Sequence, residues 1–140
     1  MNLLKNIRIT AKNVFQNEAN ALLNLIPEIG EDFEACVEDV LKSKGRVVIT
    51  GIGKSAIVAN KIVATLNSTG TPSLFMHAAD AIHGDLGMIK EEDFVICISK
   101  SGNTPEIKLL VPMLKTLGSK LIGLVGNRDS YLAKHADYVL

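Results

Sequence analysis

The feature that most constrains the fold is the alternation of short apolar runs with helical segments after residue 45. Each run is four to six residues long and rich in branched apolar side chains, as is typical of strands buried on both faces. Strands are predicted at 46–50, 73–76, 94–98 and 120–125, and a further strand begins at 137. Helices are predicted between them at 54–68 and 105–117. Strands and helices in this order are joined by crossovers, so the sequence predicts an α/β fold with a parallel sheet covered on both faces.

The first 44 residues have a different pattern, with no strand signal. A helix is predicted from about residue 3 to 26, stopping before Pro27, and a second from about 31 to 43, ended by Gly45. The apolar positions of the first helix are Ala11, Val14, Phe15, Leu22, Leu25 and Ile26, and the inward positions of the second are Phe33, Val37, Val40 and Leu41. We expect residues 1–44 to be N-terminal helices that pack on the domain of residues 45–140 and offer an oligomer interface. Residues 78–90 are mixed in character and are expected to be loop-like.

Composition excludes several function classes. Fifteen Lys and Arg residues balance fifteen Asp and Glu residues, so no broad charge attracts nucleic acid or an anionic membrane. Tryptophan is absent and aromatic residues make up 4% of the chain, which argues against a base-stacking surface. A hydrophobic content of 47% with 21% charged residues is typical of one globular domain with a real core. We therefore expect neither a nucleic-acid nor a membrane partner.

The sequence also indicates a cellular compartment. No apolar run approaches the ~18 residues that a membrane-spanning helix needs, and residues 1–5 lack the hydrophobic region of a signal peptide. We expect a cytoplasmic protein in which Cys36 and Cys97 are buried thiols and form no disulfide. The last strand ends with the chain and no covering helix follows it, so we expect the natural domain to continue further.

Residues 99–106 carry the strongest functional signal. They place Ser99, Ser101, Gly102 and Thr104 between a buried strand and a helix that opens on Pro105. Thr104 is the expected N-cap. Hydroxyl groups, a close backbone approach at glycine and free helix N–H groups form a site suited to phosphate. An ordinary capped strand-to-helix turn explains the same residues about as well.

A second loop at residues 51–56 also opens a helix. It is not a Walker A loop, because the first glycine of that motif falls on Val48. It matches a loose dinucleotide fingerprint, yet the next strand ends in Met76 and His77 without an acid to hold a ribose. A sugar-phosphate loop is the third interpretation. Lys54 would oppose the helix dipole there, which makes sense beside a bound anion, whereas a solvated lysine is the simpler explanation.

Residues 77–85 hold two histidines and two aspartates after the end of a predicted strand, where open α/β sheets bind ligands. His77 and His83 are six residues apart, which is not the spacing of a helical metal pair. Either histidine suits a sugar hydroxyl or a metal, although a loop histidine usually serves neither. Glu106 lies in the first turn of its helix, where the dipole alone explains it or where it moves a proton on a bound sugar.

The loops at 51–55 and 99–104 together resemble those of the sugar isomerase (SIS) domain. Residues 68–72, residues 77–88 and Glu106 narrow the resemblance to arabinose-5-phosphate isomerases, which supply the Kdo pathway of lipopolysaccharide and capsule synthesis. The resemblance runs from about residue 45 to 140. It implies a three-layer α-β-α sandwich with a five-stranded parallel sheet of order 2-1-3-4-5, usually in a homotetramer. The family continues past this chain, so residues 45–140 would be a C-terminally short SIS domain without a CBS module.

The resemblance also implies roles for individual residues. Lys54 and Glu106 align with residues considered catalytic. The implied substrate-binding residues are Gly53, Ser55, Gly70, Thr71, His83, Ser99, Ser101, Gly102 and Thr104. Among them, the three serines and Thr104 would hold the phosphate. His77 aligns with a histidine linked to zinc, which is taken as inhibitory, and no cofactor is required.

The implied reaction interconverts D-ribulose 5-phosphate and D-arabinose 5-phosphate. Moving a proton between C1 and C2 through an enediol(ate) needs a base and a group that stabilises the oxyanion. Glu106 suits the first role and Lys54 the second. Two alternatives stay open: a sugar-phosphate-binding or regulatory module of the same fold without chemistry, and a nucleotide-binding oxidoreductase domain.

Overall fold

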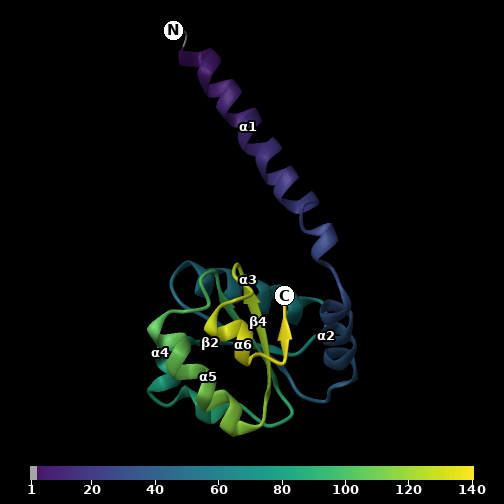
Figure 1. The fold of residues 1–140 in the computed structure, drawn as a ribbon, viewed down its shortest axis with the longest axis vertical. Helices are drawn as coiled ribbons and strands as arrows, with labels where there is room; N and C mark the ends of the chain where they lie inside the picture. The colour runs from purple at the N-terminus through teal and green to yellow at the C-terminus, as the bar shows by residue number, and fades with distance from the viewer. Residues whose placement is uncertain (1–2) are drawn as a thin grey trace. The chain divides into compact units, whose positions relative to one another are not determined.

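A computed structural model describes residues 3–140, and the chain divides into two compact units, Met1–Glu31 and Asp32–Leu140. The first unit holds helix α1 (Leu3–Leu23) and the 3-10 turn η1 (Ile26–Glu28), labelled or traceable by colour in Figure 1. The helix ends three residues earlier than predicted, and Pro27 lies in η1. Apolar side chains at the helical spacing noted in the sequence are exposed, among them Phe15 at 74% and Leu22 at 69%. The packing of residues 1–31 on the second unit stays a prediction.

The second unit is an α/β domain whose strands all run parallel. Its five-stranded sheet has the order β2-β1-β3-β4-β5, which confirms the predicted fold and strand order. In chain order its elements are α2 (Glu31–Lys42), β1 (Val47–Gly51), α3 (Lys54–Ser68), β2 (Ser73–His77), α4 (Ala78–Ile82), η2 (Asp85–Met88), β3 (Phe94–Ser99), α5 (Pro105–Leu117), β4 (Lys120–Val125), α6 (Tyr131–His135) and β5 (Tyr138–Val139).

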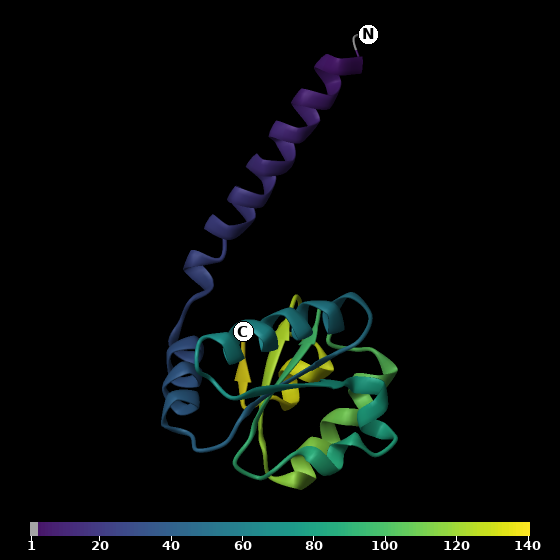
Figure 2. The same cartoon turned by 180° about the vertical axis from the view of Figure 1, so that it is seen from behind.

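Helices cover both faces of the sheet and complete the predicted three layers. Successive side chains of a strand point to opposite faces, so Val48 packs with α4, α5 and α6 while its neighbour Ile49 packs with α3. Figure 2 shows α3 and the green helices α4 and α5 on opposite sides of the strands. Helix α2 lies on the same face as α3, where Cys36 packs against Phe94 and Ile122.

Three local expectations were wrong. Residues 78–90 are not simply loop-like, because α4 and η2 form there, and α6 was not predicted. Both helices are only five residues long, too short for apolar periodicity to be recognised. In α2 the inward residues are Cys36 and Val40, whereas the other expected positions are exposed: Phe33 at 42%, Val37 at 41% and Leu41 at 79%.

The two cysteines are free and buried, as predicted. Cys97 lies at the centre of the sheet on β3, paired in register with Thr50 of β1 and Gly123 of β4. Its side chain is 0% exposed, and this burial raises the pKa of the thiol to about 12. A thiol in this state stays protonated and inert at neutral pH.

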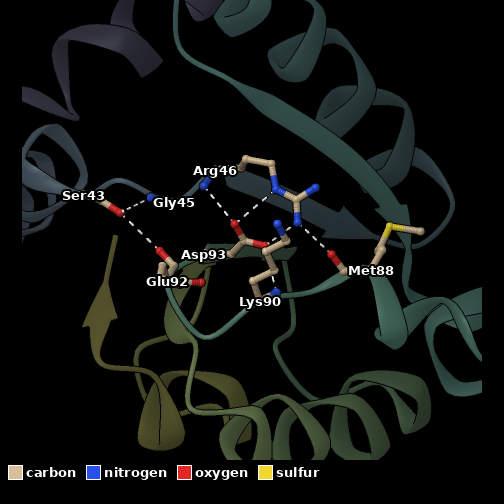
Figure 3. A network of polar contacts seen from close by, with 7 residues as sticks. All are labelled: Ser43, Gly45, Arg46, Met88, Lys90, Glu92 and Asp93. Atoms are coloured by element: carbon tan, nitrogen blue, oxygen red, sulfur yellow. Dashed lines mark hydrogen bonds and ion pairs between the residues drawn. The ribbon is translucent and has the colours of Figure 1, made fainter.

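The amino ends of β1 and β3 are locked by an ion pair (Figure 3). The Asp93 carboxylate, 1% exposed, accepts hydrogen bonds from the Arg46 amide at 2.8 Å, from its guanidinium at 2.6 Å and from the Lys90 amide at 2.9 Å. Arg46 also donates to the Met88 carbonyl oxygen at 2.7 Å. Burial by itself would raise the pKa of Asp93, but the hydrogen bonds from Arg46 and Lys90 outweigh it and lower that pKa.

The carboxyl end of the chain is tied to the rest of the domain by side chains. The Asp137 carboxylate accepts from the Leu121 amide at 2.8 Å and pairs with Lys115 at 3.0 Å. The Tyr138 hydroxyl donates to Asp39 of α2, and this hydrogen bond, more than burial, raises the pKa of Tyr138 to about 12. Within residues 3–140, no helix has both the length and the apolar character needed to cross a bilayer.

Candidate functional site

A cavity of about 450 Å³ lies at the carboxyl ends of β1 and β3. The connection after β1 leads to α3 on one face of the sheet, and the connection after β3 leads to α5 on the other. The two connections therefore diverge, which opens a crevice where α/β sheets bind their ligands. The lining residues are Ile52, Ser55, Ile98, Ser99, Lys100, Ser101, Thr104, Ile107 and Gly126. The cavity thus unites the two loops that the sequence singled out.

The loop after β3 is folded by its own hydroxyl groups. Ser99 Oγ accepts from the Gly102 amide at 3.1 Å, and Ser101 Oγ accepts from the Asn103 amide at 3.3 Å. Gly102 has φ +61°, a left-handed conformation that glycine adopts without strain. These contacts curl residues 99–104 around the cavity and bring the serine side chains to its wall.

Thr104 occupies the N-cap position of α5, as predicted, but its side chain makes no capping hydrogen bond. Its Oγ1 is buried, and no partner for it is found among residues 3–140. A buried hydroxyl without a partner is unfavourable, and Thr104 lines the cavity. The first N–H groups of α5 also lack a side-chain cap, so this end of the helix attracts an anion.

The loop after β1 brings a second helix start to the cavity. Gly53 precedes α3 with φ +58°, and no side chain caps this helix either. Gly51 lies so close to Ser55 and Ile98 that a Cβ there would be 3.1 Å from Ser55 and 3.2 Å from the Ile98 carbonyl oxygen. The end of β1 is therefore packed tightly between β3 and the first turn of α3. Ser55 of that turn lines the cavity together with residues of the Ser99–Thr104 loop.

The structure brings together only some of the predicted site residues. The four expected phosphate ligands, Ser55, Ser99, Ser101 and Thr104, all line the cavity. The two expected catalytic residues are next to it without lining it. Lys54 is exposed at the start of α3, and Glu106 is half-buried in the first turn of α5, next to Ile107 in the cavity wall.

Gly70 and Thr71 lie elsewhere. They precede the amino end of β2, whereas the cavity lies at the carboxyl ends of the strands. The sheet is parallel, so the two positions are at opposite edges, and neither residue reaches the cavity within this chain. His83 is exposed at the end of α4 and does not line the cavity.

His77 ends β2 next to Gly51 in the register. Its Nδ1 is buried, with no hydrogen-bond partner within residues 3–140, and lies 3.9 Å from a carboxylate oxygen of Asp80. No cluster of three or more potential metal ligands exists among these residues. Protein zinc sites use three or four protein ligands. Two donors alone therefore do not make a complete zinc site within the described chain.

Sequence reasoning missed five lining residues: Ile52, Ile98, Lys100, Ile107 and Gly126. The signal for Gly126 was available, because it directly follows β4 at the same edge of the sheet. The Gly126 amide donates to the Lys100 carbonyl oxygen at 3.0 Å, and a Cβ at Gly126 would lie 2.9 Å from that oxygen. Only glycine lets the end of β4 approach the loop this closely.

Known proteins match both the sequence and the fold. Residues 40–140 match the family model of the SIS domain. Arabinose 5-phosphate isomerase KdsD of Pseudomonas aeruginosa is 48% identical over 139 residues, which are 98% of this chain and 43% of that protein. Arabinose 5-phosphate isomerase KpsF of Escherichia coli CFT073 is 45% identical over 132 residues, 94% of this chain and 40% of that protein. The chain spans about two fifths of the length of these curated relatives.

The structural comparison agrees. An Escherichia coli CFT073 protein solved in complex with arabinose 5-phosphate superimposes with a TM-score of 0.91 and 40% identity, over 99% of this chain and 73% of that chain. The family model covers most of the second unit. The chain belongs to the SIS domain family.

Proposed function

We propose that this chain carries the sugar-phosphate site of an aldose–ketose isomerase that interconverts D-ribulose 5-phosphate and D-arabinose 5-phosphate. One observation carries the proposal: four hydroxyl side chains and two uncapped helix starts converge on a cavity of about 450 Å³. Two relatives that are arabinose 5-phosphate isomerases by name support the choice of reaction. A relative of the same fold solved with arabinose 5-phosphate supports the choice of ligand.

The phosphate would bind at the start of α5. Thr104 Oγ1 has no partner of its own within residues 3–140 and is free to donate to a phosphate oxygen. Ser55 and Ser101 line the cavity from the two loops and would donate alongside it. The starts of α3 and α5, neither of which has a side-chain cap, supply the positive end of each helix dipole.

With the phosphate held there, the sugar carbons would extend toward Lys54 and Glu106. Glu106 lies two residues after Thr104, so a phosphate on Thr104 keeps the substrate near this carboxylate. We assign Glu106 the transfer of the proton between C1 and C2. Lys54 would stabilise the negative charge that develops on the enediol(ate) oxygen.

The test is NMR of the purified chain with D-arabinose 5-phosphate in D₂O, which follows ribulose 5-phosphate formation and deuterium entry at C2. We expect Glu106→Gln to lower turnover by roughly 10²- to 10⁴-fold, the contribution typical of a general acid–base group. Glu92→Gln, an exposed carboxylate at the opposite edge of the sheet, is the matched control and should leave turnover unchanged. Equal turnover in the wild type and Glu106→Gln would remove Glu106 from the mechanism.

The same spectra separate the main alternative. A sugar-phosphate-binding or regulatory module would broaden the lines of arabinose 5-phosphate without moving deuterium into it. If the wild-type chain causes neither line broadening nor deuterium exchange, the proposed sugar-phosphate site itself is wrong.

Zinc inhibition through His77 is a separate proposal. His77 and Asp80 supply two donors within the described chain, so a complete site would need ligands from outside it. We expect His77→Ala to raise the zinc concentration that halves turnover by about tenfold or more, because one nitrogen ligand is lost. Asp129→Ala, an exposed carboxylate in another loop, should not change that concentration.

We also propose a homo-oligomer, with a tetramer as the expected state. Large apolar side chains are exposed on the helices, including Leu41 at 79% and Ile57 at 72%, and exposed apolar surface is typical of protein interfaces. Sedimentation equilibrium gives the mass directly. A concentration-independent monomer would contradict the proposal.

A further inference from the structure

The segment from Gly126 to Leu132 holds the loop of residues 99–104, which we call the phosphate loop, from outside the cavity. At one end, the Gly126 amide donates to the Lys100 carbonyl oxygen at 3.0 Å. At the other end, the Leu132 amide donates to the Gly102 carbonyl oxygen at 3.0 Å. The loop is thus fastened at two backbone positions by a segment of which only Gly126 lines the cavity. We call residues 126–132 the buttress.

The middle of the buttress fits closely under Gly102. Ser130 is 0% exposed and caps α6 by accepting from the Ala133 amide at 3.3 Å. A Cβ at Gly102 would lie 2.2 Å from Ser130 Oγ and 2.5 Å from Ser130 Cβ. Glycine is therefore required at position 102 for two reasons: the backbone is left-handed there, and the start of α6 leaves no room for a side chain.

Asn103 is the side chain that joins the buttress to the loop. Its Oδ1 accepts from the Tyr131 amide at 3.0 Å, and its Nδ2 donates to the Ser101 carbonyl oxygen at 3.0 Å. One amide group thus fixes the peptide that carries a cavity serine against the first turn of α6. The Asn103 side chain itself does not line the cavity.

We propose that Asn103 is a positioning residue, which sets the geometry of the phosphate loop by tying Ser101 to the buttress. This inference rests on the proposed function, because it assumes that the loop binds phosphate. The residue touches no ligand. It acts on binding through Ser101 and through the neighbouring Thr104, whose hydroxyl has to point into the cavity to meet a phosphate oxygen.

The experiment compares Asn103→Ala with Asn127→Ala. Asn127 is a matched control, because its Oδ1 accepts from the Asp129 amide at 2.9 Å within the buttress, and no hydrogen bond joins its side chain to the loop among residues 3–140. We expect Asn103→Ala to raise the dissociation constants of arabinose 5-phosphate and of inorganic phosphate by the same factor, roughly five- to tenfold for the lost hydrogen bonds. The KM should rise by that factor with kcat unchanged, and Asn127→Ala should change neither constant.

The outcomes separate the two proposals. If the wild-type chain binds neither ligand, the proposed function fails. If the wild type binds and Asn103→Ala binds as well as Asn127→Ala, the positioning role is wrong and the proposed function stands. A lowered kcat with an unchanged KM would also contradict it, because Asn103 would then act on the chemistry and not on the phosphate end.

A second measurement needs no variant. Hydrogen exchange of the Tyr131 and Leu132 amides reports on the bonds between buttress and loop, and neither residue lines the cavity. Phosphate binding should order the loop and slow the exchange of both amides severalfold, while the Asp129 amide exchanges as before. Unchanged exchange at Tyr131 and Leu132 in the presence of saturating phosphate would show that loop and buttress are not coupled.

Discussion

Buried polar groups differ between the two ends of the parallel strands, which we call the amino edge and the carboxyl edge of the sheet. At the amino edge, the Asp93 carboxylate is almost fully buried and receives four hydrogen bonds from Arg46 and Lys90. At the carboxyl edge, Thr104 Oγ1 is buried with no partner among residues 3–140, and two helices start without side-chain caps. At the amino edge the buried carboxylate has all its hydrogen-bond partners within the chain. At the carboxyl edge a buried hydroxyl and two helix starts remain able to bind a ligand.

This difference assigns stability and function to separate places. A satisfied buried carboxylate stabilises the fold and offers nothing to a ligand, whereas an unsatisfied hydroxyl lowers stability and is available for binding. Substitutions at the amino edge should therefore change unfolding alone. Removal of the unpaired Thr104 hydroxyl at the carboxyl edge should change binding without a loss of stability.

The largest effect is expected at the amino edge. Asp93→Ala should lower the free energy of unfolding by about 3 kcal/mol, because it leaves the Arg46 guanidinium and the backbone amides of Arg46 and Lys90 without their acceptor. Urea unfolding measures the loss. Glu92→Ala, whose exposed carboxylate lies next in the chain, should stay within about 0.5 kcal/mol of the wild type. Weaker arabinose 5-phosphate binding by folded Asp93→Ala would contradict the prediction that the amino edge affects stability alone.

The contribution of Asp93 should disappear in acid. The pKa of its carboxyl is lowered in the folded protein, so the stabilisation is complete above the unfolded-state pKa of about 3.9 and is lost as the pH falls through the folded-state value. The gap in unfolding free energy between the wild type and Asp93→Asn should be constant from pH 7 to 5 and narrow below pH 4. Urea midpoints across this range measure it. A gap that widens in acid would reverse the sign and contradict the ion pair.

The smallest change in stability is expected at the carboxyl edge. Thr104→Val keeps the shape of the side chain and removes its unpaired hydroxyl, so unfolding free energy should stay equal or rise by up to about 1 kcal/mol. The dissociation constant of arabinose 5-phosphate should rise about tenfold for the same loss. Thr116→Val, on the same helix, is the control: its hydroxyl donates to the Pro112 carbonyl oxygen at 3.0 Å, and binding should not change. A destabilised Thr104→Val with normal binding would make Thr104 a structural residue.

Most of the fold could be predicted because the strands carry their own signal. Buried parallel strands such as β3 are continuous apolar runs, and the crossovers between them imply that they run parallel. The short helices α4 and α6 could not be predicted, since they form through packing of Ala81 and Leu132 into the core and not through periodicity. The face of α2 was mistaken because it carries apolar side chains on two sides, and only contact with Phe94 selects Cys36.

The residues of the candidate site also fall into those that the local sequence indicates and those that it does not. The hydroxyl residues that line the cavity could be singled out because capping chemistry and proximity to a strand end are visible in the local sequence, as at Ser99 and Thr104. Gly70 and Thr71 were assigned through resemblance alone, which gives no position, and the structure places them at the opposite edge. Gly126 and Asn103 were missed because their contacts join segments far apart in the chain.

Cys97 gives the domain an internal reporter of its own opening. Alkylating reagents attack the thiolate, and this thiol is 0% exposed with a pKa raised to about 12. Its modification therefore has to wait until β3 separates from β1 and β4, its neighbours on either side. The rate of labelling at this one atom thus measures how often the middle of the sheet opens. Any ligand seated at the ends of β1 and β3 should slow it in proportion to its occupancy.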